Sequence, residues 1–371
     1  MKIAFIGQKG IPCIWGGVEN HVENISLKLS QQGKSVIVYV RNWYTPKNIK
    51  EHQAVKLVHL PTIQTKYLDA FVHTFICTIH ALFQNCDIIH YQAIGPGFFC
   101  WLPRLFGIKT VVTIHRLDYE DGKWGWFSRG FLKFSEFISL KYSSEVTVVS
   151  RELENFYRKK GYKTNYIPNG VNKPIEAKAD VITKKYNLSS KSYILACSRF
   201  APAKRIDWII KAYQSLDEPR LKLVIAGGTT HLNPYARHIA RLARNDKNIL
   251  FTGFVSGREK EELFSNARFF IHASLVEGLP IALLEAMSYG IICIASNIGP
   301  HSEIIKEGDN GFLFKHDDFK DLVQKINYAI NLNGDDIFGI NNQVARESVT
   351  DYNWQATADN TSKIYSALVA K

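Results

Sequence analysis

Residues 269–287 read FFIHASLVEGLPIALLEAM, and the order of structural signals in this segment identifies the fold class. Its apolar run at 269–272 is followed by a short loop and then by a helical pattern that opens near Pro280. Because proline suits the first turn of a helix, the stretch predicts a strand that leads directly into a helix. A continuous apolar strand is typical of a parallel sheet that is covered by helices on both faces.

The same alternation runs through the whole chain, which indicates an α/β fold with doubly wound parallel sheets. Helices are predicted between the strands, for example at residues 18–32, 67–84 and 127–142, and a last helix at 354–369. The predicted strands cover residues 3–7, 35–40, 55–60, 87–91, 110–115, 146–150, 193–198, 222–226, 249–252, 269–272 and 291–295.

The alternation pauses near residues 166–180, where Pro168 and the Asn169-Gly170 pair precede a polar stretch. We therefore expect two Rossmann-like domains, at residues 1–170 and 185–353, with a linker near residues 169–190. Two domains also suit a chain of 371 residues. The pattern alone does not assign the C-terminal helix to either domain.

Charge is distributed unevenly along the chain. The net charge of +12 comes from 46 Lys plus Arg and 34 Asp plus Glu. Residues 1–170 hold 21 basic and 12 acidic side chains, a net of +9, and residues 171–371 hold 25 and 22, a net of +3. A basic excess suggests a polyanionic partner, and nucleic acid, an anionic membrane and a phosphate-rich ligand all fit it.

The cysteines and the apolar segments bear on the compartment. The six cysteines form no C-x-x-C pair and no zinc spacing, so we expect reduced, buried thiols. No stretch reaches the roughly 20 apolar residues that a membrane-spanning helix needs. We expect a cytoplasmic protein with peripheral contact to the inner face of the cell membrane.

The loop and helix at residues 277–285 carry the most informative pair of acidic side chains. Backbone N–H groups at this helix start, Gly278-Leu279-Pro280-Ile281, would face the strand-end crevice and favour a phosphate. Glu285 could accept two ribose hydroxyls, and Glu277 could meet a second ligand group. The alternative is an exposed glutamate and an ordinary helix glutamate, but the surrounding sequence favours a functional pair.

Two cations follow the first predicted strand of the second domain. Arg199 and Lys204 lie in a loop at the carboxyl end of that strand, so both could reach the same phosphate site. Arginine can bind two phosphate oxygens at once, and lysine supplies a compact positive charge. Two solvated loop cations are the alternative.

Two features of the first domain could border the same ligand. The adjacent Gly16 and Gly17 precede a helix and allow a ligand to approach backbone N–H groups, although their spacing is not the dinucleotide fingerprint. His115 ends an apolar strand, which places it at the carboxyl edge of the sheet. An ordinary tight turn and a structural histidine are equally acceptable interpretations.

An aromatic and basic stretch occupies residues 123–134. At helical spacing Phe127, Phe131, Phe134 and Ile138 form one apolar stripe. We favour a stripe that faces the core, with an interfacial helix on an anionic membrane as the alternative.

Taken together, these motifs resemble glycosyltransferase family 4, a retaining family with the GT-B fold, of the type that builds bacterial surface polysaccharides. The fold implied is two facing Rossmann-like domains with a central cleft. The motifs span most of the chain: Gly16-Gly17-Val18-Glu19, residues 113–118 with Lys123-Trp124-Gly125, residues 167–171, Arg199 with Lys204, and residues 277–287. The chain departs from the family pattern at Cys197-Ser198, where a glycine often precedes the arginine.

The resemblance implies specific roles. The first domain would bind the acceptor and the second a nucleotide-sugar donor, and the final helix would pack back on the first domain. Arg199 and Lys204 would hold the donor diphosphate, and Glu285 the ribose. Glu277 would contact the transferred sugar, with His115 beside it and the Gly16-Gly17 loop near the phosphates.

We therefore expect a retaining, metal-independent glycosyltransferase that moves a sugar from a UDP-, GDP- or dTDP-sugar to a lipid-linked glycan acceptor. No D-x-D pair of the kind that binds manganese is present, and no cofactor is expected. The product would belong to a surface polysaccharide or a lipopolysaccharide. A nucleotide-sugar epimerase of the same fold and a non-enzymatic nucleic-acid-binding or membrane-binding protein are the alternatives, but no nucleic-acid-binding module is recognisable.

Overall fold

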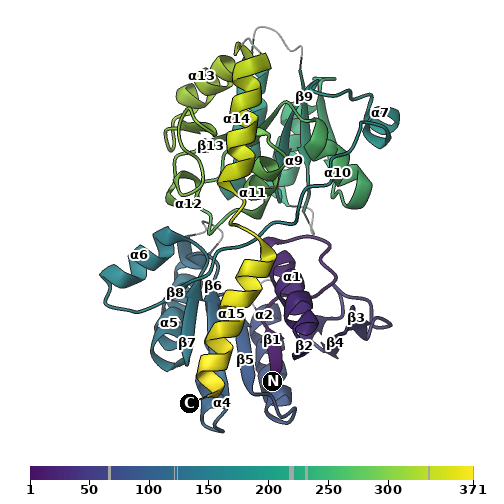
Figure 1. Ribbon diagram of the computed structural model, residues 1–371. Coiled ribbons are helices and arrows are strands. Elements are labelled where there is room, and N and C mark those ends of the chain that lie inside the picture. Colours follow the sequence, from purple (N-terminus) through teal and green to yellow (C-terminus); the bar gives the residue numbers. More distant parts are fainter. Residues whose placement is uncertain are drawn as a thin grey trace. The chain divides into compact units, whose positions relative to one another are not determined.

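The computed structural model describes residues 1–65, 68–120, 122, 124–216, 221–229, 233–332 and 335–370, with backbone only at 335–341. The chain forms two compact units (Figure 1). The first comprises Met1–Gly170 together with Trp354–Lys371, and the second comprises Val171–Asn353. Each unit is a sheet with helices on both faces, which confirms the predicted α/β architecture.

The first unit is built on an eight-stranded sheet in the order β3-β4-β2-β1-β5-β6-β7-β8. All neighbouring strands are parallel except β3 and β4. The strands are β1 Lys2–Ile6, β2 Ser35–Arg41, β3 Glu51–His52, β4 Val55–Leu60, β5 Ile88–Gln92, β6 Lys109–Ile114, β7 Glu145–Val148 and β8 Asn165–Tyr166. The main helices are α1 Gly17–Gln31, α2 Leu68–Leu82, α3 Ile94–Gly97, α4 Trp101–Arg104, α5 Trp126–Tyr142, α6 Arg151–Lys159 and α15 Trp354–Val369.

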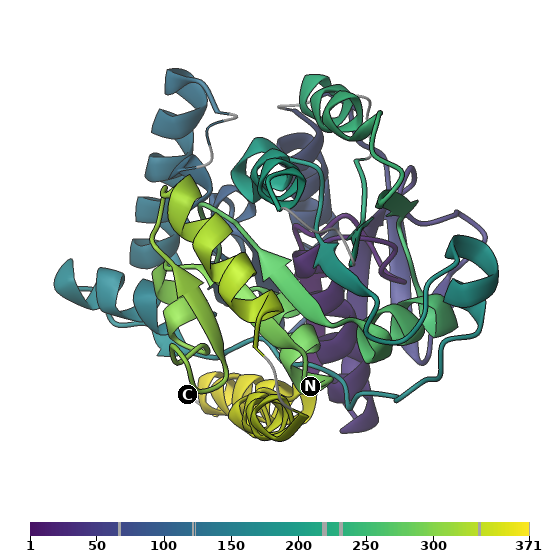
Figure 2. The same ribbon diagram turned by 90° about the horizontal axis from the view of Figure 1, so that it is seen from above.

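The strand order of the first unit reverses between β1 and β5. Right-handed crossovers then put α1 on one face of the sheet and α2, α3 and α5 on the other. The C-terminal helix α15 lies beside α1 (Figure 1 and Figure 2). Its Thr357 donates a hydrogen bond to the carbonyl of Pro168 at 2.9 Å, which ties this helix to the end of the first unit.

The second unit has a six-stranded parallel sheet in the order β11-β10-β9-β12-β13-β14, and its strand order reverses between β9 and β12. Its strands are β9 Tyr193–Cys197, β10 Lys222–Ala226, β11 Ile249–Gly253, β12 Phe269–His272, β13 Ile292–Ser296 and β14 Gly311–Phe314. Its helices include α7 Val181–Tyr186, α8 Ile206–Gln214, α9 Pro234–Ala243, α10 Gly257–Asn266, α11 Ile281–Ser288, α12 Gly299–Ser302, α13 Phe319–Ile330 and α14 Asp335–Ser348.

The segment predicted as a linker is partly structured. The second unit begins at Val171, and helix α7 lies inside the range 169–190. The buried Glu262 accepts hydrogen bonds from the backbone N–H groups of Asp180 and Ile182, and Ile182 is itself buried. Because the segment is mostly polar, its sequence gives no indication of these few buried contacts.

The aromatic stripe of α5 faces the core only in part: Phe131 and Ile138 are half-buried, whereas Phe127 and Phe134 are exposed, so that interpretation is wrong for two of the four residues. Its buried residues are Leu132, Ser135, Glu136 and Ser139, whereas Phe127 is 73% exposed. A Cβ on Gly97 would lie 2.2 Å from the Ser139 oxygen, so α5 approaches α3 through small residues. The rings of Trp126, Phe127, Phe134 and Phe137 are left exposed.

These rings join others on the same face of the sheet. We call the following exposed set the aromatic surface: Phe71, Phe75, Ile79, Phe83, Trp101, Leu105, Phe106, Trp126, Phe127, Phe134 and Phe137. Helix α2, which contributes the first of them, is still too short to span a bilayer, as is every helix in the described ranges.

Candidate functional site

The loops that follow β9 and β12 meet at the point where the strand order of the second unit reverses. Leu275 donates a backbone hydrogen bond to the carbonyl of Ala203 at 2.8 Å, which joins the two loops. Lys204 from the first loop forms an ion pair with Glu277 from the second. Ligands of doubly wound sheets bind outside the carboxyl ends of the strands at such a reversal, so this is the expected place for a site.

A glycine allows the neighbouring strand to come close to this site. Gly227 follows β10 with a φ of +118°, and a Cβ there would lie 2.0 Å from the carbonyl oxygen of Ser198. Only glycine accepts both this backbone conformation and this approach. The position therefore fixes the path of the loop that carries Arg199.

Glu277 is held by two partners on one oxygen. Besides Lys204, its Oε1 accepts a hydrogen bond of 2.8 Å from Nε2 of His272, the last residue of β12. Burial alone would raise the pKa of Glu277, but Lys204 and His272 outweigh it and bring the pKa well below its ordinary value. The carboxylate is thus charged at neutral pH, while burial lowers the pKa of His272 and leaves its imidazole neutral.

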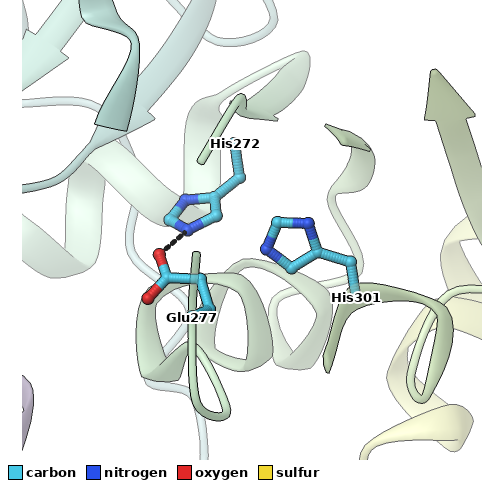
Figure 3. A group of neighbouring side chains, drawn as sticks. All are labelled: His272, Glu277 and His301. Atoms are coloured by element: carbon cyan, nitrogen blue, oxygen red, sulfur yellow. Dashed lines mark hydrogen bonds and ion pairs between the residues drawn. The ribbon is translucent and has the colours of Figure 1, made fainter. Parts of the chain in front are cut away.

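His301 of α12 lies next to this pair (Figure 3). Its Nδ1 is 2.7 Å from the carbonyl oxygen of Ser296, so Nδ1 carries the proton and donates it. Burial lowers the pKa of His301 to about 3. Its other nitrogen, Nε2, is buried and has no hydrogen-bond partner among the described residues.

Glu285 lies in helix α11 and also has a lysine partner. Lys260 of α10 approaches its Oε1 at 2.7 Å, and the two side chains are 33% and 20% exposed. Burial lowers the pKa of Lys260, but Glu285 raises it by more, so the ammonium stays charged. The second carboxylate of the motif is therefore oriented by a cation on a neighbouring helix.

Arg199 and the start of α11 complete this edge. The Arg199 side chain is exposed in the loop after β9. Pro280 is the residue before the helix rather than its first helical residue, and α11 begins at Ile281. Leu279 and Ile281 are buried and anchor the turn that begins at Gly278, which leaves the first backbone N–H groups of the helix pointing out of its N-terminus.

The Gly16-Gly17 turn of the first unit is pinned by its own side chains. The Tyr44 hydroxyl accepts from the backbone N–H groups of Ile14 and Trp15, at 2.9 and 3.1 Å, and donates to the carbonyl of Trp15 at 2.8 Å. Glu19 accepts from the backbone N–H of Lys9 at 3.0 Å and pairs with its ammonium at 3.3 Å. Gly16 and Gly17 stand at the start of α1, where the first backbone N–H groups of a helix have no partner within the helix itself.

His115 follows β6 and belongs to a cluster of neutral imidazoles. Its Nε2 is 2.9 Å from the Gln92 side-chain oxygen, and its ring lies 4.7 Å from that of His21. Burial, followed by the nearby His90, lowers the pKa of His115 to about 3. His90 in turn contacts the hydroxyl of Tyr365 on α15 at 2.5 Å, so the C-terminal helix supports this cluster.

The structure brings Lys204 into direct contact with Glu277 and puts Arg199, Glu285 and the start of α11 at the same sheet edge of the second unit. Gly16, Gly17 and His115 lie at the strand ends of the first unit. Lys123 of the aromatic and basic stretch lies outside the described residues. Sequence reasoning missed His272, His301 and Lys260, because no spacing rule links these residues to Glu277 or Glu285.

Comparison with known proteins identifies both units. Residues 15–173 match the family model described as Glycosyltransferase Family 4, and residues 179–343 match Glycosyl transferases group 1. A UDP-Gal:alpha-D-GlcNAc-diphosphoundecaprenol alpha-1,3-galactosyltransferase of Escherichia coli is 25% identical over 302 residues, which cover 77% of this chain and 76% of that protein.

Solved structures agree on the fold. A sucrose-phosphate synthase from Thermosynechococcus elongatus superposes with a TM-score of 0.86 at 21% identity, over 100% of this chain and 99% of its own. An Anabaena protein in complex with UDP-glucose gives 0.80 at 17% identity, over 99% and 100%. The chain therefore belongs to glycosyltransferase family 4, and it is a glycosyltransferase with the GT-B fold.

Proposed function

We propose that this glycosyltransferase moves a sugar, with retention of its anomeric configuration, from a nucleotide-diphosphate sugar to a lipid-linked glycan acceptor in surface polysaccharide or lipopolysaccharide assembly. The observation that carries the proposal is the pair of Lys–Glu contacts on either side of the start of α11: Lys204 with Glu277, and Lys260 with Glu285. Two oriented carboxylates suit the hydroxyls of a sugar and of a ribose, and the helix start between them suits a diphosphate.

The donor diphosphate is bound by Arg199, Lys204 and the N–H groups at the start of α11. Glu285 accepts the ribose hydroxyls, and Glu277 accepts a hydroxyl of the transferred sugar. Gly16 and Gly17 bring two further N–H groups to the donor phosphates. These assignments rest on charge and position: Lys204 is largely buried beside Glu277, and Arg199 is exposed at the same edge.

In the transfer step the bond between the anomeric carbon and the diphosphate oxygen breaks, and the bond to the acceptor oxygen forms on the same face of the sugar. Charge grows on the leaving diphosphate, and fixed cations and helix N–H groups stabilise it without reorganisation. An oxygen of the leaving phosphate takes the acceptor proton, so no metal ion is required. His115 is neutral and contributes a hydrogen bond rather than a charge.

The acceptor side is proposed from the first unit. Its sequence carries a net charge of +9, and the aromatic surface exposes rings such as Trp126, which is 87% exposed. Aromatic and basic side chains together suit the headgroup region of an anionic bilayer. The name of the galactosyltransferase relative specifies a diphosphoundecaprenol acceptor, which favours a lipid-diphosphate acceptor here and peripheral contact with the membrane's inner face.

A thermal-shift screen of nucleotide sugars tests the donor. Both the galactosyltransferase relative and the Anabaena neighbour are described with UDP-sugars, so we expect a UDP-sugar to raise the melting temperature more than GDP- or dTDP-sugars. Arg199→Ala and Glu285→Ala should fold normally and lose transfer. Near-normal turnover in either variant, or isomerisation of the donor without any acceptor, would contradict the proposal.

Flotation with anionic liposomes at low salt tests the membrane contact. The wild-type protein should float with the liposomes, and the double variant Trp126→Ala/Phe127→Ala should float at least about tenfold less, because it loses two exposed rings. Phe83→Ala removes a ring from the other end of the aromatic surface and should have a smaller effect. Failure of the wild-type protein to float would remove the membrane part of the proposal.

A further inference from the structure

Three side chains that can bind a metal ion converge beneath the Lys204–Glu277 contact. His272 ends β12, Glu277 follows it in the loop, and His301 lies in α12. One potential ligand atom from each lies within 4.8 Å of the other two. Figure 3 shows the three side chains pointing toward one another from separate segments of the second unit.

The Nε2 atom of His301 is unusual in this cluster because it is buried and unsatisfied. His301 is 0% exposed, and this nitrogen has no partner among the described residues. Because Nδ1 donates its proton to the carbonyl of Ser296, Nε2 holds a lone pair that can only accept a proton or bind a metal. An unsatisfied buried acceptor is costly, so the arrangement indicates that something fills this position.

We propose that His272, Glu277 and His301 bind a Zn²⁺ ion. Two imidazole nitrogens and one carboxylate form a donor set that zinc prefers, whereas Mg²⁺ and Ca²⁺ prefer oxygen ligands. His301 needs no change to bind, and the carbonyl of Ser296 orients its ring, as is usual for the second nitrogen of a zinc-bound histidine. His272 binds after its proton moves from Nε2 to Nδ1.

Lys204 determines what the ion does. The ammonium and His272 both contact Oε1 of Glu277, so a zinc ion that recruits this carboxylate weakens both contacts. The ion is then an inhibitor rather than a cofactor, because it withdraws Glu277 from the transferred sugar. This consequence rests on the proposed function, but the binding of the ion does not.

Titration of the untagged full-length protein tests binding directly. We expect calorimetry with ZnCl₂ to detect one tight site, and CoCl₂ to give the visible absorption of a four-coordinate ion. His301→Asn keeps a donor near Ser296 but lacks the outer nitrogen, and should bind zinc at least about tenfold more weakly. His316→Asn, which removes an exposed imidazole, is the matched control and should bind as the wild type does.

A second ligand variant tests whether weaker binding by the first comes from the lost ligand rather than from misfolding. His272→Gln can still donate to Glu277 but removes an imidazole ligand, so it too should bind zinc at least about tenfold more weakly. Equal zinc affinity in the wild type and in both ligand variants would overturn the site, as would the absence of tight binding in the wild type.

Measurements of sugar transfer in the presence of zinc separate this proposal from the proposed function. Zinc should inhibit sugar transfer by the wild type, EDTA should restore it, and His301→Asn should need at least about tenfold more zinc for the same inhibition. Zinc binding without transfer from any nucleotide sugar would contradict the proposed function and leave the site supported. Zinc binding without inhibition of an active enzyme would overturn the inhibitory role.

Discussion

The two units place chemically different groups at equivalent points of their sheets. Where the strand order of the second unit reverses, the side chains are charged and paired: Lys204 with Glu277, and, one helix away, Lys260 with Glu285. At the strand ends of the first unit the central group is a cluster of neutral imidazoles, His21, His90 and His115. Charged pairs also occur in that unit: Lys9 with Glu19 pins the glycine turn, and Arg116 with Asp118 follows β6 just beyond His115.

This difference indicates a division of labour. Fixed charges are useful where a diphosphate leaves, because its growing charge must be stabilised without rearrangement. Neutral imidazoles can donate or accept a hydrogen bond without carrying a charge, so they suit uncharged hydroxyls. The same sheet topology therefore places ligand-binding groups at the strand ends of both units, and the local sequence determines whether those groups are charged or neutral.

Glu277→Gln should produce the largest effect. Glutamine can still accept from His272, but it leaves the largely buried Lys204 without a counter-charge and removes a charged acceptor from the sugar site. We expect turnover to fall about 1,000-fold, the loss typical of a key electrostatic group. The control is Glu154→Gln, which breaks an exposed ion pair of 2.8 Å with Arg151 and should leave turnover unchanged. Similar turnover in both variants would break the contrast between the units.

Gly16→Ala should destabilise the fold of the first unit. Gly16 has a φ of +108°, and a Cβ there would lie 1.9 Å from an oxygen of Glu19. We expect the free energy of unfolding in urea to fall by about 2–3 kcal/mol from backbone strain and crowding together. Gly33→Ala is matched in backbone, with a φ of +77°, but nothing lies within 4 Å of its Cβ. Gly33→Ala should lower the unfolding free energy by only about 1 kcal/mol. Equal losses in the two variants would show that crowding against Glu19 does not contribute.

Lys260→Met should have a moderate effect confined to the donor. The variant keeps the apolar stem but removes the cation that orients Glu285. Because the pair is partly exposed, we expect a loss of about 1 kcal/mol, a roughly fivefold rise in the nucleotide dissociation constant by calorimetry. Lys185→Met breaks a more exposed pair with Glu259 of the same helix and should leave the affinity unchanged.

His115→Gln should have the smallest effect, visible in the pH dependence of stability. The folded protein keeps His115 neutral down to a pKa of about 3, whereas the unfolded chain takes up a proton near pH 6.5. The contribution of His115 to the unfolding free energy is therefore full above pH 6.5 and is lost as the pH falls toward 3. Between pH 7 and pH 6 the unfolding free energy of the variant should fall by about 0.5–1 kcal/mol less than that of the wild type. Parallel pH profiles would show that the pKa of His115 is not lowered in the folded protein.

Much of the fold was readable from local patterns, and the reasons are specific. The predicted strand 269–272 and the helix 354–369 agree with β12 and α15 in the structure. The strands β3 and β8 were not predicted, because two residues carry no periodicity, and the four-residue strand β14 was also missed. The stripe of α5 is only half inward for another reason: apolar spacing identifies a helix face but not its neighbour, and here Gly97 and Ser139 make the close contact.

Local sequence patterns are sufficient to predict the architecture and the principal candidate residues at the site. A strand followed at once by a helix puts Glu277 and Glu285 at a sheet edge, and the loop after β9 puts Arg199 and Lys204 at the same edge, because parallel strands end together. The order of strands, loops and helices along the chain is enough to place these four residues at the sheet edge.

The pairing of groups at the site, in contrast, depends on the tertiary fold. His272, Glu277 and His301 come together across a loop, a strand and a helix, and Lys260 reaches Glu285 from α10. Burial then sets their protonation: it keeps the imidazole of His301 neutral and leaves one nitrogen unsatisfied. No spacing rule encodes these contacts, since they depend on how distant segments pack and how far water is excluded.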